Sequence, residues 1–399
     1  MKKILFTLLV IISTVVSAQK FEGLAQTPPL GWNSWNTFAT DINEQLVKDI
    51  ADKFVTLGLK DAGYEYIVLD DGWMAKERDA NGNLVADPVK FPSGIKALAD
   101  YIHAKGLKFG LYNCAGNTTC AGYPGSRGHE YQDAKLYASW HVDFLKYDWC
   151  NTENINAIGA YTTMGNALIA AGRPIILSIC EWGDNEPWKW AGTIGQQWRV
   201  TGDIINCWDC EVGHGSWSSS GIWKIINMRK DIRKAAGPSN WNDYDMMEVG
   251  NGMTNAEDRS HFAMWTMLTS PLIMGNDIRS ATPETIKTLS NKEVIAVNQD
   301  KLGIQGFRFT NENDLEVWIK PIENNAWVIS FVNMKEVPVE INFDWTKHEI
   351  GDNVNNKQLK VKEKTYKIRD LFNHKDFGDT SKVLKTTIGV HDVFMIKVY

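Results

Sequence analysis

Short apolar segments alternate with longer helix-period segments from about residue 28 to residue 300, and this alternation limits the fold more than any other feature of the chain. The candidate strands are, in order, PLGWNSW, YEYIVLDD, KFGLYN, FLKYDW, PIILSIC, QQWRVTGD, NWNDYDM and PLIMGND. Between them, segments such as residues 43–63 carry apolar side chains at helical spacing and end at a glycine. Eight strands that alternate with helices over this length predict a (β/α)8 TIM barrel.

A doubly wound open sheet is the alternative architecture for such an alternation. No glycine-rich phosphate loop follows the first strand of this sequence, which favours the barrel. In a barrel, the C-terminal ends of all the strands meet at one mouth. The sequence therefore predicts that the chemistry takes place where the strands end.

The pattern of the sequence changes after about residue 300. Segments such as DLEVWIKPI, NAWVISFVNM and DVFMIKVY alternate with a period of two and are separated by turns rich in Asn, Gly and Lys. We therefore predict a barrel domain at residues 19–300 and a small C-terminal antiparallel β-sandwich at residues 301–399. No aromatic stripe marks this second domain, so we expect it to be structural rather than sugar-binding.

The first 18 residues have the pattern of a secretory signal peptide. A basic start is followed by an apolar run from Ile4 to Val16 and by the small residues Ser17 and Ala18. A buried N-terminal helix is the alternative interpretation. We expect a protein that is secreted across the inner membrane, periplasmic or extracellular, and not membrane-bound once the signal is cleaved.

Charge and cysteine usage exclude some classes of function. The formal net charge is −6, and positive and negative residues are mixed rather than grouped, which argues against nucleic acid as a partner. Export permits disulfides among the six cysteines, but spacing alone does not fix their pairing. Cys207 and Cys210, with Glu211 and His214 nearby, resemble half of a metal site. The matching half is missing, so we predict a local disulfide or two free thiols there and no metal or cofactor.

Acidic side chains stand at the ends of several predicted strands. They are Asp70 and Asp71, Asp148, Glu181, Asp203, Asp243 and Asp245, and Asp277. One aspartate at a strand end commonly caps the next helix, but capping does not explain why so many converge on one mouth. Several acids with few histidines indicate chemistry by a pair of carboxylates, as in glycoside hydrolysis.

Two of these acids fit the two roles that glycoside hydrolysis requires. Asp148 shares a strand face with Lys146, a cation that would keep the carboxylate ionised and suited to act as a nucleophile. Asp203 follows Thr201 and Gly202 with less obvious neutralisation, which suits a general acid/base. Trp35, at the end of the first strand, offers an apolar face to a sugar ring.

The motifs TPPLGWNSWN, LDDGW, TTCAGYPGS, FLKYDWC, SICEWG, WRVTGDI, NWNDYDMMEVGNG and SPLIMGNDIR resemble those of the α-galactosidases of glycoside hydrolase family 27, in the same order and spacing. The resemblance covers residues 27–279 and continues weakly into the second domain through KIRDLFNHKDFG. It implies a retaining exo-hydrolase of terminal α-linked galactose that uses no cofactor, with Asp148 as nucleophile and Asp203 as acid/base. The substrate-binding positions that it implies are Trp35, Asp70, Asp71, Tyr112, Lys146, Cys180, Glu181, Trp182, Arg199, Asp245 and Met246.

The resemblance also implies a disulfide between Cys120 and Cys150, with two buried thiols as the alternative. Bulk at Glu181 and Asp184 indicates a sugar with a plain 2-hydroxyl rather than an acetamide, and the paired aspartates in LDDGW favour galactose over an arabinopyranoside. An α-N-acetylgalactosaminidase, a β-L-arabinopyranosidase and a catalytically dead sugar-binding barrel are the alternatives. The natural galactoside and the oligomeric state stay open.

Three features depart from the family pattern. Tyr244 stands where the family usually has proline, and Cys114 where an acidic or small residue is expected. The segment NCWDCEVGHGSW, which follows Asp203, is longer than in many relatives. We expect this segment to shape a subsite for the sugar beyond the cleaved bond.

Overall fold

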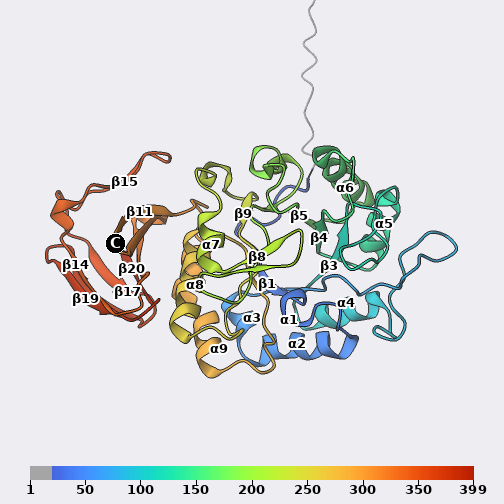
Figure 1. The fold of residues 1–399 in the computed structure, drawn as a ribbon, viewed down its shortest axis with the longest axis horizontal. Helices are drawn as coiled ribbons and strands as arrows, with labels where there is room; N and C mark the ends of the chain where they lie inside the picture. Colours follow the sequence, from blue (N-terminus) through green and yellow to red (C-terminus); the bar gives the residue numbers. More distant parts are fainter. Residues whose placement is uncertain (1–19) are drawn as a thin grey trace, which may run out of the picture.

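The computed structural model describes residues 20–399, and the predicted signal peptide lies outside this range. Figure 1 shows two parts, a ring of helices around a central sheet and a separate set of sheets formed by the C-terminal residues. Within the described residues, no helix combines the length and the apolar character that are needed to cross a bilayer.

The central sheet contains eight parallel strands, in the order β10-β1-β2-β3-β4-β5-β6-β9. They are β1 (Leu30–Asn33), β2 (Tyr66–Val68), β3 (Lys108–Cys114), β4 (Phe144–Asp148), β5 (Ile176–Cys180), β6 (Gln197–Arg199), β9 (Trp241–Asp243) and β10 (Leu272–Met274). The sheet closes through Met247, just after β9, whose N–H donates to the Ile273 carbonyl on β10 at 2.7 Å. Each predicted strand segment contains one of these strands, except that β3 extends one residue beyond KFGLYN, so the predicted barrel is confirmed.

Helices surround the barrel: α1 to α8 lie between barrel strands in the chain, and α9 and α10 follow the last one. They are α1 (Trp35–Phe38), α2 (Glu44–Thr56), α3 (Leu59–Ala62), α4 (Ile95–Ala104), α5 (Glu130–Ser139), α6 (Ala157–Ala171), α7 (Ile222–Asn227), α8 (Asn255–Met267), α9 (Pro283–Leu289) and α10 (Lys292–Asn298). The helix predicted over residues 43–63 is interrupted at Gly58, which has φ of 73°. Helix α7 ends at Asn227, and the chain does not resume a right-handed helix at Asp231, which has φ of 60°.

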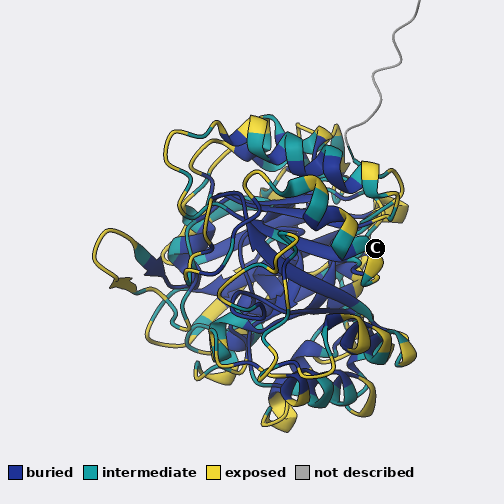
Figure 2. Cartoon of the chain, turned by 90° about the vertical axis from the view of Figure 1, so that its right-hand side faces the viewer, coloured by how far each residue is buried: buried dark blue, intermediate teal, exposed yellow. Residues whose placement is uncertain are grey.

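The barrel core forms because most strand side chains are buried and longer helices such as α2 turn an apolar face toward them. In α2, Asn43 caps the helix by accepting from the Leu46 N–H at 2.9 Å, and Val47, Ile50 and Phe54 are fully buried. Figure 2 shows the strands as a buried centre and the helices with exposed outer faces. This packed core holds the strand ends, and the residues on them, in fixed positions.

The C-terminal residues form an antiparallel β-sandwich, as predicted. One sheet contains, in order, β11 (Phe307–Glu312), β12 (Leu315–Pro321), β13 (Trp327–Asn333), β20 (Val393–Val398), β17 (Lys367–Asp370) and β18 (Lys375–Asp379). The pair β14 (Val339–Phe343) and β19 (Leu384–Ile388) packs on it, and Phe331, Phe343 and Phe394 meet in the core between them. A further pair, β15 (Ile350–Asp352) and β16 (Lys357–Leu359), completes the domain.

The two domains meet along α8, which contacts β12, β13 and β20. Arg259 on α8 donates two hydrogen bonds to the Asp392 carboxylate, at 3.0 and 2.6 Å. Lys320 on β12 is fully buried at this interface, where its ammonium donates to the Thr266 carbonyl at 3.2 Å. Burial lowers the pKa of Lys320 to about 7, because the charged form loses its hydration.

We predict that Lys320→Met stabilises the protein near pH 7, by on the order of 1–4 kcal/mol. The lysine binds a proton in the unfolded chain up to its ordinary pKa near 10.4 but releases it in the folded chain above about 7. The unfolded state therefore holds more protons between these values, and the stability of the wild type should rise with pH there. Calorimetric melting of Lys320→Met should show a higher Tm than that of the wild type and a weaker rise of stability with pH. The control is Lys397→Met on β20. A Tm of Lys320→Met that is unchanged or lower would contradict the prediction.

Candidate active site

The polar rim at the C-terminal ends of the barrel strands contains most of the predicted site residues. Parallel pairing sets Cys114, Asp148 and Cys180 side by side at the ends of β3, β4 and β5. A cavity that reaches down into the barrel is lined by Lys146, Cys180, Arg199, Asp245 and Met246, together with Asn33, Val68, Phe144, Ser178, Gln197, Asp243 and Ile273. Charged groups from the three strands β4, β6 and β9, and from the turn after β9, thus face one confined space.

Asp70 and Asp71 lie in the turn after β2, and both are buried. Asp70 accepts hydrogen bonds from the Asn33 amide at 2.7 Å and from the Lys146 ammonium at 2.8 Å. Asp71 accepts from the Ala121 N–H at 2.8 Å, and burial raises its pKa. Asn33 lies outside the motif LDDGW: it belongs to the motif GWNSWN and reaches Asp70 from the neighbouring strand.

Asp148, at the end of β4, is buried, and the N–H of Trp149 donates to its carboxylate at 2.8 Å. We predicted that Lys146 keeps this acid ionised, but the direct ion pair of Lys146 is with Asp70. Burial raises the pKa of Asp148 to about 7, and the more distant charge of Lys146 only partly opposes this effect. The cation that we expected to keep Asp148 ionised is therefore paired with another acid, and burial favours the protonated form of Asp148.

A disulfide joins Cys120 and Cys150, the pairing that the resemblance implied. It fixes the loop after β3 to the loop after β4, and its sulfur atoms lie within 4.8 Å of the nearest Asp148 oxygen. The Tyr112 hydroxyl donates to Cys120 Sγ at 3.2 Å, which places the tyrosine ring under this loop. Cys114, one of the departures from the family pattern, is a buried free thiol that donates to the Cys150 carbonyl.

Arg199 on β6 is buried and holds two acids at once. Its guanidinium donates to Asp203 at 3.0 Å and forms an ion pair with Asp245 at 2.9 Å. Asp203 was predicted to have little neutralisation, and this is wrong, because the arginine turns back onto it. The two acids still differ in solvation: 39% of the Asp203 side chain is exposed, against 5% for Asp245.

Asp245 stands in a strained turn after β9. Its φ is 80°, a conformation that costs a non-glycine residue on the order of 1–3 kcal/mol. The turn is held by Trp265, whose indole N–H donates to the Asp245 carbonyl at 2.7 Å, and by Gln305, which donates to the hydroxyl of buried Tyr244 at 2.9 Å. Tyr244 therefore replaces the usual proline as a packed anchor beneath this turn.

The loop after β5 forms another part of the rim. Glu181 is fully buried, and its Oε2 accepts from the N–H and the side chain of Asn185, at 2.6 and 2.7 Å. Its other oxygen, Oε1, is buried without a hydrogen-bond partner in the structure, and burial raises the pKa of Glu181 to about 7. Trp182 has φ of 57° and lines an open cavity of about 510 Å³. The lining of this cavity is Cys120, Trp149, Cys150, Asn151, Thr152, Glu153, Trp182 and Asp184.

Trp35 is half-buried at the start of α1, where its backbone N–H donates to the side chain of Asn33 at 2.8 Å. Sequence reasoning missed Gln197 in the lining of the deep cavity, and it gave Asp243 no role there. Gln197 donates to Asp243 at 3.1 Å below the ion pairs of Arg199. The signal of Gln197 in the sequence is weak, because it looks like an ordinary polar residue within a short strand, whereas Asp243 was counted only among the acids at the strand ends.

Comparison with known proteins places this geometry in a family. Residues 27–300 match the family described as α-galactosidase A, and residues 312–398 match the α-galactosidase C-terminal β-sandwich domain. The chain is 52% identical to α-galactosidase A of Cellvibrio japonicus over 387 residues, 97% of this chain and 95% of that one. The chain belongs to the α-galactosidases of glycoside hydrolase family 27.

Two further α-galactosidases show how far the similarity extends. The α-galactosidase of Cyamopsis tetragonoloba is 49% identical over 81% of this chain and 77% of its own. The structure of the Saccharomyces cerevisiae α-galactosidase with raffinose is 31% identical, has a TM-score of 0.88, and covers 96% of this chain and 99% of that one. Both domains are thus shared with α-galactosidases, which are glycoside hydrolases.

The long segment after Asp203 forms a hairpin in this α-galactosidase. Its strands are β7 (Glu211–Gly213) and β8 (Ser218–Ser220), and Figure 2 shows a hairpin with one exposed strand that stands out from the barrel. Cys207 and Cys210 form a local disulfide at its base, one of the two possibilities that the sequence left open. The Ser220 N–H donates to the Asp203 carbonyl at 2.9 Å, so the hairpin is tied to that rim residue.

Proposed function

We propose that this α-galactosidase is a retaining exo-hydrolase in which Asp148 is the nucleophile and Asp203 the general acid/base. The observation that carries this proposal is the contrast between the two acids. Asp148 is buried beside the disulfide, whereas Asp203 is partly open to water. A nucleophile gains from a dry site, and an acid/base must exchange its proton with water.

The reaction proceeds in two displacements. In the first, Asp203 protonates the glycosidic oxygen while an Asp148 oxygen attacks the anomeric carbon; the bond to the leaving alcohol breaks and a galactosyl ester forms. In the second, Asp203 takes a proton from water, which attacks the same carbon and releases Asp148. Two inversions return the α-configuration. Arg199 supports the first step, because its charge stabilises the Asp203 carboxylate once that acid has given up its proton.

Three acids that follow β2 and β5 support galactose as the sugar bound at the barrel mouth. Asp70 and Asp71 present carboxylate oxygens that suit the 4- and 6-hydroxyls, and the Lys146–Asp70 pair holds one of them in place. Glu181 Oε1, a buried acceptor without a partner in the structure, is suited to a 2-hydroxyl donor. Compared with a hydroxyl, an acetamide at carbon 2 would leave less space beside this oxygen and would present its hydrogen-bond donor in a different geometry.

The open cavity beside Asp148 supports action on galactosides with further sugars attached. It is walled by Trp149 and Trp182, whose rings suit stacking on sugars, and by Asn151, Glu153 and Asp184, whose polar groups suit hydroxyls. We place the leaving sugar here, or against the hairpin that follows Asp203. A site that depends on the Cys120–Cys150 disulfide also fits secretion into an oxidising compartment.

We predict an acid limb with a pKa of about 7 in the pH profile of kcat/KM for 4-nitrophenyl α-galactoside. Asp148 attacks only when ionised, and burial raises its pKa to about 7, so activity falls as the pH drops through that value. Lys146 opposes the shift, so Lys146→Met should move the limb to higher pH. A profile that stays flat down to pH 4 would exclude this assignment of the limb.

We predict that azide separates the two catalytic roles. Asp148→Ala should lose turnover, and azide should partly restore it from the vacated face and give the β-galactosyl azide by a single inversion. The matched variant Asp203→Ala should lose about 10²–10⁴-fold and give the α-galactosyl azide, because azide then attacks the galactosyl ester. NMR of the azide products distinguishes these results. An α-azide from Asp148→Ala would mean that Asp148 is not the nucleophile.

We predict that Glu181 controls selection at carbon 2. The wild type should cleave 4-nitrophenyl α-galactoside and not the N-acetylgalactosaminide or the β-L-arabinopyranoside. Glu181→Ala should raise the relative rate on the N-acetyl substrate by about tenfold, which corresponds to about 1.4 kcal/mol. Glu181→Gln keeps the bulk and should keep the selectivity, and Lys189→Ala, on the same loop, is the control. Preference of the wild type for the N-acetyl or arabinosyl substrate would refute the galactosidase assignment.

A further inference from the structure

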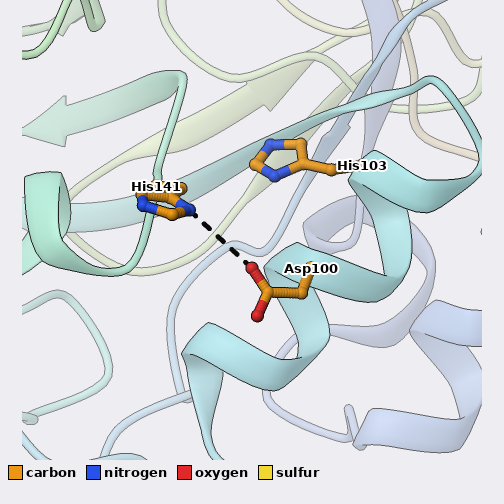
Figure 3. Close-up of side chains that lie close together, drawn as sticks. All are labelled: Asp100, His103 and His141. Carbon is orange, nitrogen blue, oxygen red and sulfur yellow. Dashed lines mark ion pairs between the residues drawn. The ribbon is translucent and has the colours of Figure 1, made fainter.

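Two histidines and a carboxylate gather on the outside of the barrel, at the end opposite the candidate active site. Asp100 and His103 lie one turn apart on α4, and His141 lies in the loop that leads into β4. Figure 3 shows the two imidazole rings and the carboxylate turned toward a common space. This loop enters β4 at its N-terminal end, whereas Asp148 stands at its C-terminal end, so the cluster is separated from the mouth by the length of the strand.

The spacing of the three groups matches the size of a metal ion. One ligand atom from each residue lies within 4.8 Å of the others, and His141 Nδ1 is 3.7 Å from Asp100 Oδ1. The centre of an equilateral triangle lies at its side divided by √3 from each corner. Sides of 3.7–4.8 Å therefore place a central ion about 2.1–2.8 Å from each atom. Zinc binds nitrogen and carboxylate oxygen at about 2.0–2.2 Å, which a small closing movement of exposed side chains provides.

A second carboxylate orients His103 toward this space. Its Nε2 lies 2.7 Å from Asp143 Oδ2, which leaves Nδ1 on the side that faces Asp100 and His141 in Figure 3. Asp143 is itself fixed, because it accepts from the Phe109 N–H at 2.9 Å and forms an ion pair with Arg173. Metal-binding histidines commonly donate their other ring N–H to a carboxylate held in this way.

The other two candidate ligands, His141 and Asp100, are also oriented toward the common space. His141 has φ of 62°, a conformation that is unfavourable for a non-glycine residue and that directs its side chain toward α4. Asp100 binds Lys96 through Oδ2 at 2.7 Å, which leaves Oδ1 to face the histidines. Half of the side-chain surface of Asp100 and of His141 is exposed, so an ion can reach them.

We propose that Asp100, His103 and His141 bind a divalent transition metal, with zinc as the ion that their two nitrogens and one oxygen suit best. The fourth position is left to water. The ion would link α4 to the loop before β4, two segments that are otherwise joined at this point by side-chain contacts alone. Its effect is on stability, because the N-terminal face of a barrel carries no catalytic groups. The proposal does not depend on the retaining mechanism.

The test is a titration of the tag-free protein with ZnCl2 after chelation, followed by calorimetry and by thermal melting near neutral pH. We expect one zinc per chain and a higher Tm, with kcat on 4-nitrophenyl α-galactoside unchanged. His141→Asn tolerates the left-handed backbone, and Asp100→Asn keeps the side-chain size. Each should lower the zinc affinity by more than about tenfold and remove the rise in Tm. The control is His374→Asn, at a histidine with φ of 55° that pairs with Glu293, and it should bind zinc like the wild type.

Three results would overturn the proposal. The first is the absence of stoichiometric binding to the wild type. The second is a titration that is the same for the wild type, His141→Asn and Asp100→Asn, which would assign the zinc to another part of the surface. The third is inhibition by zinc that survives in both variants without any rise in Tm of the wild type, which would place the ion at the acids of the mouth. Galactosidase activity is measured separately in metal-free protein, so failure of this proposal leaves the proposed function intact.

Discussion

The buried charges at the barrel mouth are stable only because they compensate one another. Lys146, which is largely shielded from solvent, and buried Arg199 are the two cations of the deep cavity, and each is held by a buried carboxylate, Asp70 and Asp245 respectively. Removal of either partner would leave an unpaired charge in a dry site, which costs several kcal/mol. Closure of the barrel at Met247 keeps the two pairs around one cavity, because it makes β9 and β10 neighbours in the ring. The fold and the site therefore depend on the same geometry.

This arrangement also explains how two similar acids acquire different properties. Both cations are committed to other carboxylates, so Asp148 receives only part of their field and the cost of its burial dominates. Asp203 shares Arg199 with Asp245 and stays in contact with water. The arrangement of the charges around the rim, rather than the residue types, gives the two carboxylates different environments, one buried and one solvated. A change in any pairing would shift the behaviour of both.

The sequence was sufficient to predict the barrel, its eight strands and the position of the acids at their ends, because these follow from periodicity and from parallel connection. It was not sufficient for the partners of the charges. Lys146 and Asp148 share a strand face, which suggested a pair, yet the ammonium reaches across two strands to Asp70. Likewise, four residues separate Arg199 from Asp203, and only the turn after β6 brings them together. Such contacts depend on side-chain directions that no period in the sequence encodes.

The same limit hid the cluster on the opposite face. His103 and His141 are far apart in the sequence and match no metal motif, and only the packing of α4 against the start of β4 brings them together. Strand β4 thus joins two different environments: Asp148 at one end, where burial opposes charge, and Asp143 at the other, where a carboxylate orients a histidine. In a barrel these ends evolve under different demands, since the C-terminal end serves chemistry and the N-terminal end serves stability. A metal ion bound at the N-terminal end would stiffen the start of the strand that carries Asp148 without adding charge to the mouth.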